Sequence, residues 1–216
     1  MLTSSSLIPI NTREKNFELL MNIYQKATNQ VVEELEQVRE LINYWYGYEA
    51  ISNITARIKT PKSIIKKMKK KNYALTYQNL ITKINDIAGI RIVCPLKTDI
   101  YTILNMIEQM PNIKIINRKD YISKPKESGY SGYHLIIQTM VVVENKQLPI
   151  KVEIQLRTMA MDFWATNEHK IKYKTNKKLS SLDSKKLTIY AKILNMLDNK
   201  IMKIAQKQNK SQVAIK

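Results

Sequence analysis

The chain has 216 residues, of which 44% are hydrophobic, and its formal net charge is +18. This length suits one compact domain with helical extensions and is too short for two full domains. The charge favours a polyanionic ligand, because Lys and Arg offset phosphate charge, and both nucleotide polyphosphates and RNA fit that description. A solvated basic surface is the alternative interpretation.

Cysteine and histidine are scarce, and this excludes several classes of protein. Cys94 is the single cysteine and lies in an apolar run, so no disulfide framework within the chain is expected. His134 and His169 are the only histidines, which argues against a zinc site of Cys and His. The N-terminus lacks the pattern of a signal peptide, and no window has the length and apolar character of a membrane span. We therefore expect a soluble, cytoplasmic protein.

The first part of the chain predicts helices alternating with strands. Hydrophobic residues recur at helical spacing before Gly47, which ends the first helix. Thr60 as N-cap and Pro61 at the first helical position indicate the start of another helix. The expected elements are a helix over 13–45, a strand over 51–59, a helix over 61–71, a strand over 88–94, a helix ending at Glu108 and a strand near 113–117.

The second part begins with a segment, 118–133, whose prolines and glycines predict a loop. It is followed by strands over 134–143 and 150–157, which the polar turn 144–147 joins, and by helices over 159–174 and 184–205. The order of elements predicts an α/β (α+β) layer fold with a mixed sheet flanked by helices.

Glycine-rich phosphate loops are missing from the sequence. Its glycines, which are Gly47, Gly89, Gly129 and Gly132, form neither a GxxxxGK loop nor a GxGxxG turn. If a nucleotide binds, side chains must hold its phosphates.

Residues 150–157 alternate between apolar and polar side chains. One face has Ile150, Val152, Ile154 and Leu156, and the other has Lys151, Glu153, Gln155 and Arg157. A half-exposed strand with a solvated outer face accounts for this pattern. The floor of an active site accounts for it equally well, and there Glu153 could bind a metal ion or accept a proton.

A second constellation joins a strand to the helix after it. Arg57 and Lys59 come from the strand, and Ser63 and Lys67 share a face of the helix, whose N-terminus attracts anions. This arrangement suits a phosphate site. The alternative is a basic amphipathic helix, since further lysines occur in the same stretch.

Two other groups of polar residues are candidates for the same site. Asp86 and Arg91 flank a strand start near Gly89, where a carboxylate can reach a metal ion, although Asp before a strand is also a common turn residue. The segment KPKESGYSGYH, from Lys124 to His134, suits base stacking and phosphate binding. An ordinary loop explains it as well.

Taken together, four ordered motifs resemble the synthetase family related to RelA and SpoT, and the chain is similar to its small single-domain alarmone synthetases. The stretches that carry the resemblance are RIKTPKSIIKK, DIAGIRIV, DYISKPKESGYSGYH and VEIQLRTMAMDFWATNEH. The family implies a nucleotidyltransferase-like mixed sheet flanked by helices, with Mg²⁺ as cofactor. The resemblance implies an N-terminal helical region over 1–47, the synthetase domain over 48–176, and a C-terminal helix and basic tail over 177–216.

The resemblance also implies roles for individual residues. Glu153 and Asp86 would be catalytic and bind Mg²⁺, and Glu153 would also activate the 3′-hydroxyl. The ATP site would consist of Arg57 and Arg91, which sandwich the adenine, and of Lys59, Ser63 and Lys67, which hold the phosphates. The guanine-nucleotide site would consist of Tyr130, which stacks on guanine through the face of its ring, and of Lys126, His134, Gln155 and Ala165.

The implied reaction transfers pyrophosphate from ATP to the 3′-hydroxyl of GDP, GTP or GMP and releases AMP. Hydrolase domains of longer relatives have an adjacent His-Asp pair; here His134 precedes Leu135 and His169 precedes Lys170, so a synthetase without hydrolase activity is expected. Related small synthetases form homotetramers, and the two long terminal helices are compatible with subunit contacts. Single-stranded RNA is a further candidate partner.

One stretch departs from the family pattern. The residues around the Gly-Tyr pair are Ser128, Ser131 and Gly132, where the family usually has Asn before the pair and a basic or amide residue followed by Ser after it. This leaves the phosphorylation state of the acceptor open. A non-catalytic RNA-binding module and another nucleotidyltransferase on the same fold are the alternatives, but carboxylates within basic motifs would repel RNA.

Overall fold

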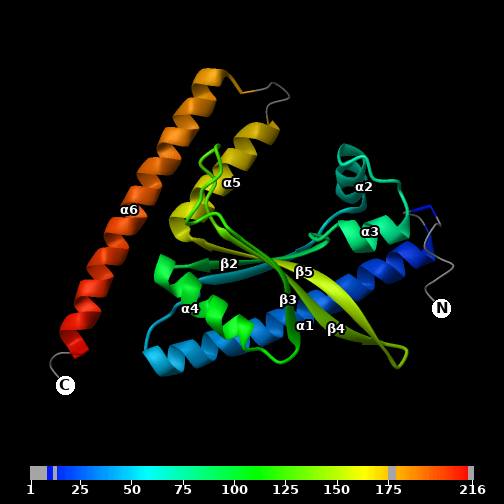
Figure 1. Cartoon of the computed structure of the whole chain (residues 1–216), viewed down its shortest axis with the longest axis horizontal. Coiled ribbons are helices and arrows are strands. Elements are labelled where there is room, and N and C mark those ends of the chain that lie inside the picture. Colours follow the sequence, from blue (N-terminus) through cyan, green and yellow to red (C-terminus); the bar gives the residue numbers. More distant parts are fainter. Residues whose placement is uncertain (1–8, 12–13, 175–178, 214–216) are drawn as a thin grey trace.

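The computed structural model describes residues 9–11, 14–174 and 179–213, which form a mixed sheet with helices on both sides (Figure 1). The elements in chain order are α1 (Lys15–Tyr46), β1 (Asn53–Ile58), α2 (Pro61–Lys70), α3 (Tyr77–Lys83), β2 (Ala88–Cys94), α4 (Lys97–Glu108), β3 (Ile113–Asp120), β4 (Tyr133–Val143), β5 (Lys146–Thr158), α5 (Met159–Lys174) and α6 (Ser181–Val213).

The sheet has five strands in the order β1-β2-β5-β4-β3, so the last strand in the sequence lies at its centre. Strands β2 and β5 are parallel, and the other neighbours are antiparallel. The register places Gly89 opposite Glu153 and Arg91 opposite Gln155. Residues of two distant motifs therefore become direct neighbours at the centre of the sheet.

One face of the sheet is apolar and is covered by α1 and α4. Helix α1 contacts β1, β2, β4 and β5, and α4 contacts β2, β3 and β5 (Figure 1). Ile92, Leu135 and Ile154 are fully buried in this layer. Full burial of one such side chain contributes roughly 1.5–3 kcal/mol, so this layer is the hydrophobic core that supports the opposite, polar face.

Strand β5 confirms the alternation predicted over 150–157 and extends it toward the N-terminus. The expected four-residue turn 144–147 is wrong, because β4 and β5 are joined by Glu144 and Asn145 alone. Both residues have positive φ, 47° and 61°, as a tight two-residue hairpin turn requires. The ladder therefore begins at once with Val143 opposite Lys146.

One helix and one strand in the first part of the chain differ from the expectation. Helix α2 begins at Pro61 as predicted, and the Thr60 side chain accepts a hydrogen bond from the Ser63 backbone N–H. Helix α3 was not expected, because its seven residues are too few to show a helical period; the Thr76 side chain caps it. Strand β3 is longer than predicted and contains a register shift between Ile115 and Asn117.

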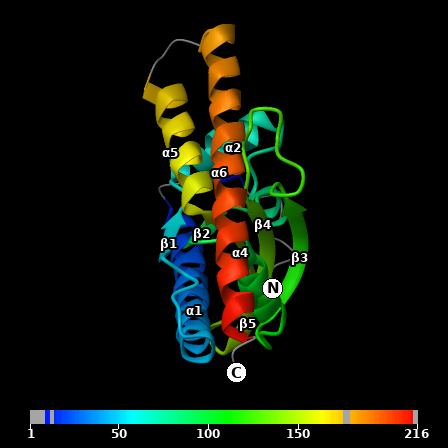
Figure 2. The same cartoon turned by 90° about the vertical axis from the view of Figure 1, so that its left-hand side faces the viewer.

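Helix α6 begins before the predicted residue 184 and continues beyond 205, to Val213. It runs alongside α5 and also contacts α4 (Figure 2). Polar contacts fix it to the body: the Thr158 hydroxyl donates to Asp198 at 2.8 Å, and the Lys97 ammonium donates to Asn199 at 2.7 Å. None of the described helices combines the length and apolar character that crossing a membrane demands.

Candidate active site

The polar face of the sheet collects most of the residues singled out in the sequence. Across β1, β2, β5 and β4, one row of neighbours consists of Arg57, Gly89, Glu153 and Ile136. Residues paired across strands point to the same side of a sheet. With no side chain at Gly89, the Arg57 side chain lies over this position, and its Cγ and Nε atoms would be 3.9 Å from a Cβ atom built there.

Asp86 lies just before β2 and forms ion pairs with two lysines of the motif RIKTPKSIIKK. The ammonium groups of Lys59 and Lys67 lie 2.9 Å and 2.7 Å from its Oδ2 atom. Burial favours the protonated form of Asp86, but the two lysines outweigh burial and hold its pKa below the ordinary value. Its other oxygen, Oδ1, is buried without a partner, which is unusual for a carboxylate.

Glu153 is held by two neighbours on the polar face of the sheet. Its Oε1 lies 3.0 Å from Nδ1 of His134, and its Oε2 accepts a hydrogen bond of 2.9 Å from the Gln155 amide. Burial raises the pKa of Glu153, but His134 and Gln155 oppose it, and the net pKa lies below the ordinary value. Glu153 is therefore a carboxylate at neutral pH and can accept a proton.

Tyr130 lies in an aromatic group at the edge of the site. Its ring meets Tyr121 and His134 edge to face, and the Lys126 ammonium lies 4.7 Å from its centroid. The Tyr130 hydroxyl contacts Nε2 of His134, so Tyr130, His134 and Glu153 form a continuous hydrogen-bonded chain. Burial raises the pKa of Tyr130, so its hydroxyl stays protonated at neutral pH.

Arg157 connects the aromatic group to β2. It donates to Tyr130 at 3.1 Å, to Gln155 at 2.8 Å and to Asp162 at 2.9 Å. Asp162 also pairs with Arg91 at 3.3 Å. One carboxylate thus bridges two guanidinium groups, one on the strand of the predicted ATP site and one behind the predicted guanine site.

A cleft of about 570 Å³ brings the two halves of the predicted site together. Of the residues singled out in the sequence, it is lined by Lys67, Asp86, Lys126, His134 and Glu153. Sequence reasoning missed several other lining residues, which are Lys71, Tyr73, Lys83, Asn85, Asn117, Lys119 and Tyr121. The place of Lys119 in the cleft follows only from the strand register, which pairs it with His134 across β3 and β4. Tyr121 stood within the motif DYISKPKESGYSGYH.

Seven of the predicted residues do not line this cleft: Arg57, Lys59, Ser63, Arg91, Tyr130, Gln155 and Ala165. The Ser63 hydroxyl is exposed and lies 2.8 Å from the Thr60 hydroxyl, at the start of α2. Ala165 of α5 is buried in a small cluster with Trp164 of the same helix and Ala191 of α6. Tyr130 packs against that cluster. The place of Ala165 is therefore behind Tyr130 and not on the wall of the cleft.

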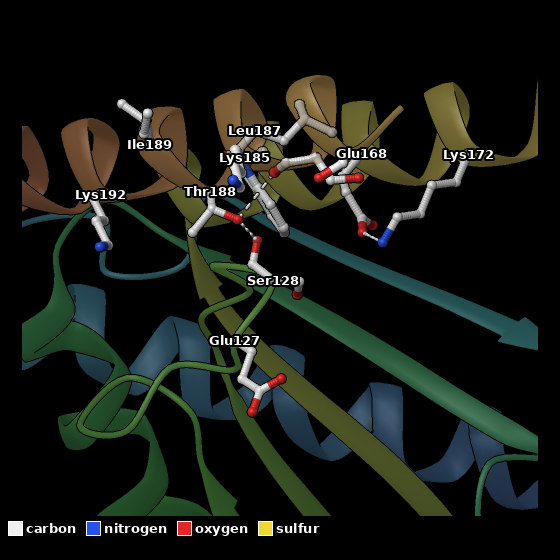
Figure 3. A pocket seen from close by; sticks show the side chains of 12 residues that line it. Glu127, Ser128, Glu168, Lys172, Lys185, Leu187, Thr188, Ile189 and Lys192 are labelled. Atoms are coloured by element: carbon white, nitrogen blue, oxygen red, sulfur yellow. Dashed lines mark hydrogen bonds and ion pairs between the residues drawn. The ribbon is translucent and has the colours of Figure 1, made fainter. Parts of the chain in front are cut away.

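A second cleft, of about 630 Å³, lies between α5, α6 and the segment before Tyr130 (Figure 3). Its lining includes Glu168 and Lys172, which pair with each other, and Thr188 of α6. Neither Asp86 nor Glu153 lines it. The first cleft, where two carboxylates and several cations converge, is therefore the candidate active site.

Comparison with known proteins identifies the family. The family described as the region found in RelA / SpoT proteins matches residues 56–178, which include all four motifs. The chain belongs to the RelA/SpoT family. Its relative YwaC of Bacillus subtilis, a GTP pyrophosphokinase, is 36% identical over 182 residues, which are 84% of this chain and 87% of that protein.

Solved structures confirm the fold of this RelA/SpoT member. The small alarmone synthetase 1 of B. subtilis bound to its product pppGpp superposes with a TM-score of 0.83 at 30% identity, over 90% of this chain and 98% of that one. The same enzyme bound to AMPCPP gives a TM-score of 0.78 at 28% identity, over 91% and 100%. The mixed sheet with long terminal helices is thus the fold of small alarmone synthetases, as the sequence predicted.

Proposed function

We propose that this RelA/SpoT member is a GTP pyrophosphokinase that transfers pyrophosphate from ATP to the 3′-hydroxyl of GTP, GDP or GMP and releases AMP. The observation that carries the proposal is the cleft in which Asp86 and Glu153 face cations from both sides. The alignment with a relative of this name covers 87% of that protein, and the superposition on a solved small alarmone synthetase covers 98% of that chain. A synthetase without a hydrolase activity fits the chain, in which no His-Asp pair occurs.

The donor side of the proposed site lies on β1, α2 and β2. Lys59 and Lys67 converge within 2.9 Å of Asp86, and we assign both to the phosphates of ATP. Ser63, in the first turn of α2, adds a hydroxyl at a helix N-terminus, where anions are favoured. Arg57 and Arg91 occupy neighbouring strands on the same face and would hold the adenine between planar guanidinium groups.

The acceptor side lies on β4, β5 and the loop before β4. We assign Tyr130 to the guanine ring, and Lys126 and His134 to the acceptor phosphates. Gln155 holds Glu153 through its amide and so supports the acceptor pocket. Ala165 contributes from behind, because it packs in the cluster that supports the Tyr130 ring.

The proposed reaction is an in-line displacement. The 3′-oxygen of the guanosine nucleotide attacks the β-phosphorus of ATP, the bond from the β-phosphorus to the α,β-bridging oxygen breaks, and AMP leaves with that oxygen. The proton of the 3′-hydroxyl passes to the carboxylate of Glu153. Most of the rate enhancement comes from alignment and from neutralising charge on the moving pyrophosphate, which the lysines of the cleft provide.

The donor set also fits Mg²⁺. Proteins usually bind this ion through one or two carboxylates together with substrate phosphates, and within the described residues no group of three or more His, Cys, Asp or Glu gathers. Asp86 has a buried oxygen without a partner in the cleft that Glu153 also lines, so these two residues would hold the ion. The ion would neutralise phosphate charge during transfer.

The decisive experiment incubates the full chain with ATP, Mg²⁺ and each of GMP, GDP and GTP. We expect equimolar AMP and a more anionic guanosine product, and the three rates rank the acceptors. Formation of AMP without a guanosine product would indicate another nucleotidyltransferase. Tight binding of single-stranded RNA without any nucleotide product would support the RNA-binding module.

We also propose that the chain assembles with further copies of itself, as the resemblance implies. Large apolar side chains remain exposed on both long helices; Trp45 at the end of α1 is 63% exposed, and Ile201 and Ile204 on α6 are 58% and 61% exposed. Light scattering of the full chain tests this proposal: a homotetramer is expected, and a monomer at micromolar concentration would refute it.

A further inference from the structure

Helix α6 touches the acceptor loop at a point where almost no space is left. We define the acceptor loop as residues 126–132. A Cβ atom built on Gly129 would lie 2.5 Å from the Cβ atom of Ala191, which is closer than two carbon atoms can approach. Ala191 is only 8% exposed. The loop and the helix can therefore approach this closely only because position 129 is glycine and position 191 is alanine.

A second contact joins the same two segments. The hydroxyl of Thr188, one turn before Ala191, lies 3.3 Å from the backbone carbonyl of Ser128 and 3.1 Å from that of Ser184, so its one proton is shared between the loop and its own helix (Figure 3). The space beside this junction is a cavity of only about 20 Å³, lined by Gly129, Ser131 and Ala191 among others. It has room for about one water molecule and not for a larger aliphatic side chain.

The acceptor loop transmits a displacement of Gly129 directly to the acceptor residues. The backbone N–H of Gly129 donates to the carbonyl of Lys126 at 2.8 Å, and the N–H of Lys126 donates to the carbonyl of Tyr130 at 3.0 Å. Gly129 itself has φ = +90°, a conformation that favours glycine. Two backbone hydrogen bonds therefore link Gly129 through Lys126 to Tyr130.

The helix is the fixed partner in this contact. Trp164 of α5 donates to the backbone carbonyl of Leu187 at 2.9 Å, and Asp198 and Lys97 tie the next turns to the body of the protein. A larger side chain at position 191 would therefore displace the acceptor loop rather than the helix.

We propose that Ala191 is a positioning residue: through Gly129 it sets the height of the acceptor loop, and so the place of Tyr130 and Lys126 over the guanosine nucleotide. The proposal rests on the assignment of this loop to the acceptor. The donor residues Lys59 and Lys67 are on α2 and before it, apart from this contact, so the size of residue 191 controls acceptor binding and leaves ATP binding unchanged.

The test is a graded series at position 191: Ala191→Ser, Ala191→Val and Ala191→Leu. The KM for the acceptor is expected to rise with side-chain size, at least tenfold for Leu and least for Ser, while the KM for ATP stays within twofold of wild type. Ala205→Leu is the matched control, because Ala205 is on the same helix about 21 Å farther along and is expected to change neither KM. Equal rises in both KM values, or none, would overturn the proposal.

A double-mutant cycle keeps the proposal testable even where a large substitution prevents folding. Gly129→Ala should weaken GDP binding in calorimetry, and adding Ala191→Gly to it should recover at least threefold of the lost affinity, because the Cβ–Cβ clash is removed. Additive losses would show that the two positions do not act through contact. Calorimetry with GDP alone also distinguishes a failure of this proposal from a failure of the proposed activity. It measures GDP binding by the acceptor loop whether or not the wild type releases AMP.

Discussion

The hydroxyl of Tyr130 accepts a hydrogen bond of 3.1 Å from the guanidinium of Arg157, although Tyr130 was singled out for its ring. The same hydroxyl contacts Nε2 of His134. Because a carboxylate can only accept, Nδ1 of His134 donates to Glu153, and Nε2 on the other side of the ring meets the tyrosine hydroxyl. The hydroxyl of Tyr130 thus orients His134, and the ring, which has the Lys126 ammonium 4.7 Å and the Arg157 guanidinium 5.2 Å from its centroid, is the part that we propose stacks on guanine.

This division of tasks predicts a graded response at Tyr130. Tyr130→Ala should weaken acceptor binding about 5- to 150-fold, since stacking on a base contributes roughly 1–3 kcal/mol. Tyr130→Phe keeps the ring but leaves His134 and Arg157 without their partner, so we expect intermediate acceptor affinity and a larger loss in kcat. Calorimetry with GDP and with ATP checks this, and ATP affinity should be nearly unchanged in both variants. A Phe variant as weak as Ala in GDP binding would contradict a stacking role.

Glu153→Gln tests the carboxylate without removing its hydrogen-bonding shape. Loss of the proton acceptor and of a metal ligand should lower kcat by several powers of ten, each worth about 1.4 kcal/mol of barrier. The thermal midpoint should change little. Glu108→Gln, which removes one charge of a surface pair with Arg118, is the matched control and should be fully active. Activity of the Glu153 variant within tenfold of wild type would rule out the assignment.

Lys59→Ala and Lys67→Ala should raise the KM for ATP about tenfold or more, because a hydrogen bond to a charged group contributes roughly 1.5–3 kcal/mol. GDP affinity should stay within twofold. Lys69→Ala is the control, since Lys69 is an exposed lysine on the same helix, α2, that does not line the cleft. Steady-state kinetics with each substrate varied in turn measure these effects. A selective loss of GDP binding would reverse the assignment of the two lysines.

The lowered pKa of Asp86 predicts how stability depends on pH. Because Lys59 and Lys67 favour the ionised form in the folded state, the carboxylate contributes stability at pH values above its unfolded pKa, about 3.9. That contribution is lost as the pH falls through the lower folded-state value. The difference in thermal midpoint between wild type and Asp86→Asn should therefore be largest near neutral pH and shrink below pH 4. A difference that is constant from pH 7 to pH 3 would contradict the ion-pair cluster.

The sequence predicted the polar face of β5 because alternation survives in any sheet that has one covered side. It also predicted which motifs belong together, since a family resemblance links residues that are far apart in the chain. It could not predict the burial of Arg157, which is 7% exposed. Alternation places Arg157 on the polar face, but only the register and α5 show that Tyr130 and Asp162 enclose it.

Other features depend on contacts between elements and have no local pattern. Lys119 enters the cleft through its pairing with His134, which depends on a register shift in β3. The contact between Gly129 and Ala191 requires the relative placement of a loop and a helix, and these two residues are 62 positions apart in the sequence. Glycine at position 129 shows in the sequence that space is limited there, but it does not show what limits it.

The central place of β5 has a consequence for how the protein becomes active during its synthesis. Strands β1 and β2 can pair early, but the inner edge of β2 waits until α4, β3, β4 and finally β5 have been made. Pairing of parallel strands across such a distance is slow, and the open edge is exposed to other chains meanwhile. Asp86 and Glu153 meet only when that last pairing is complete. With the roles proposed for these two carboxylates, a nascent or partly folded chain is expected not to consume ATP, and the onset of nucleotide turnover would then be a direct kinetic readout of the final folding step.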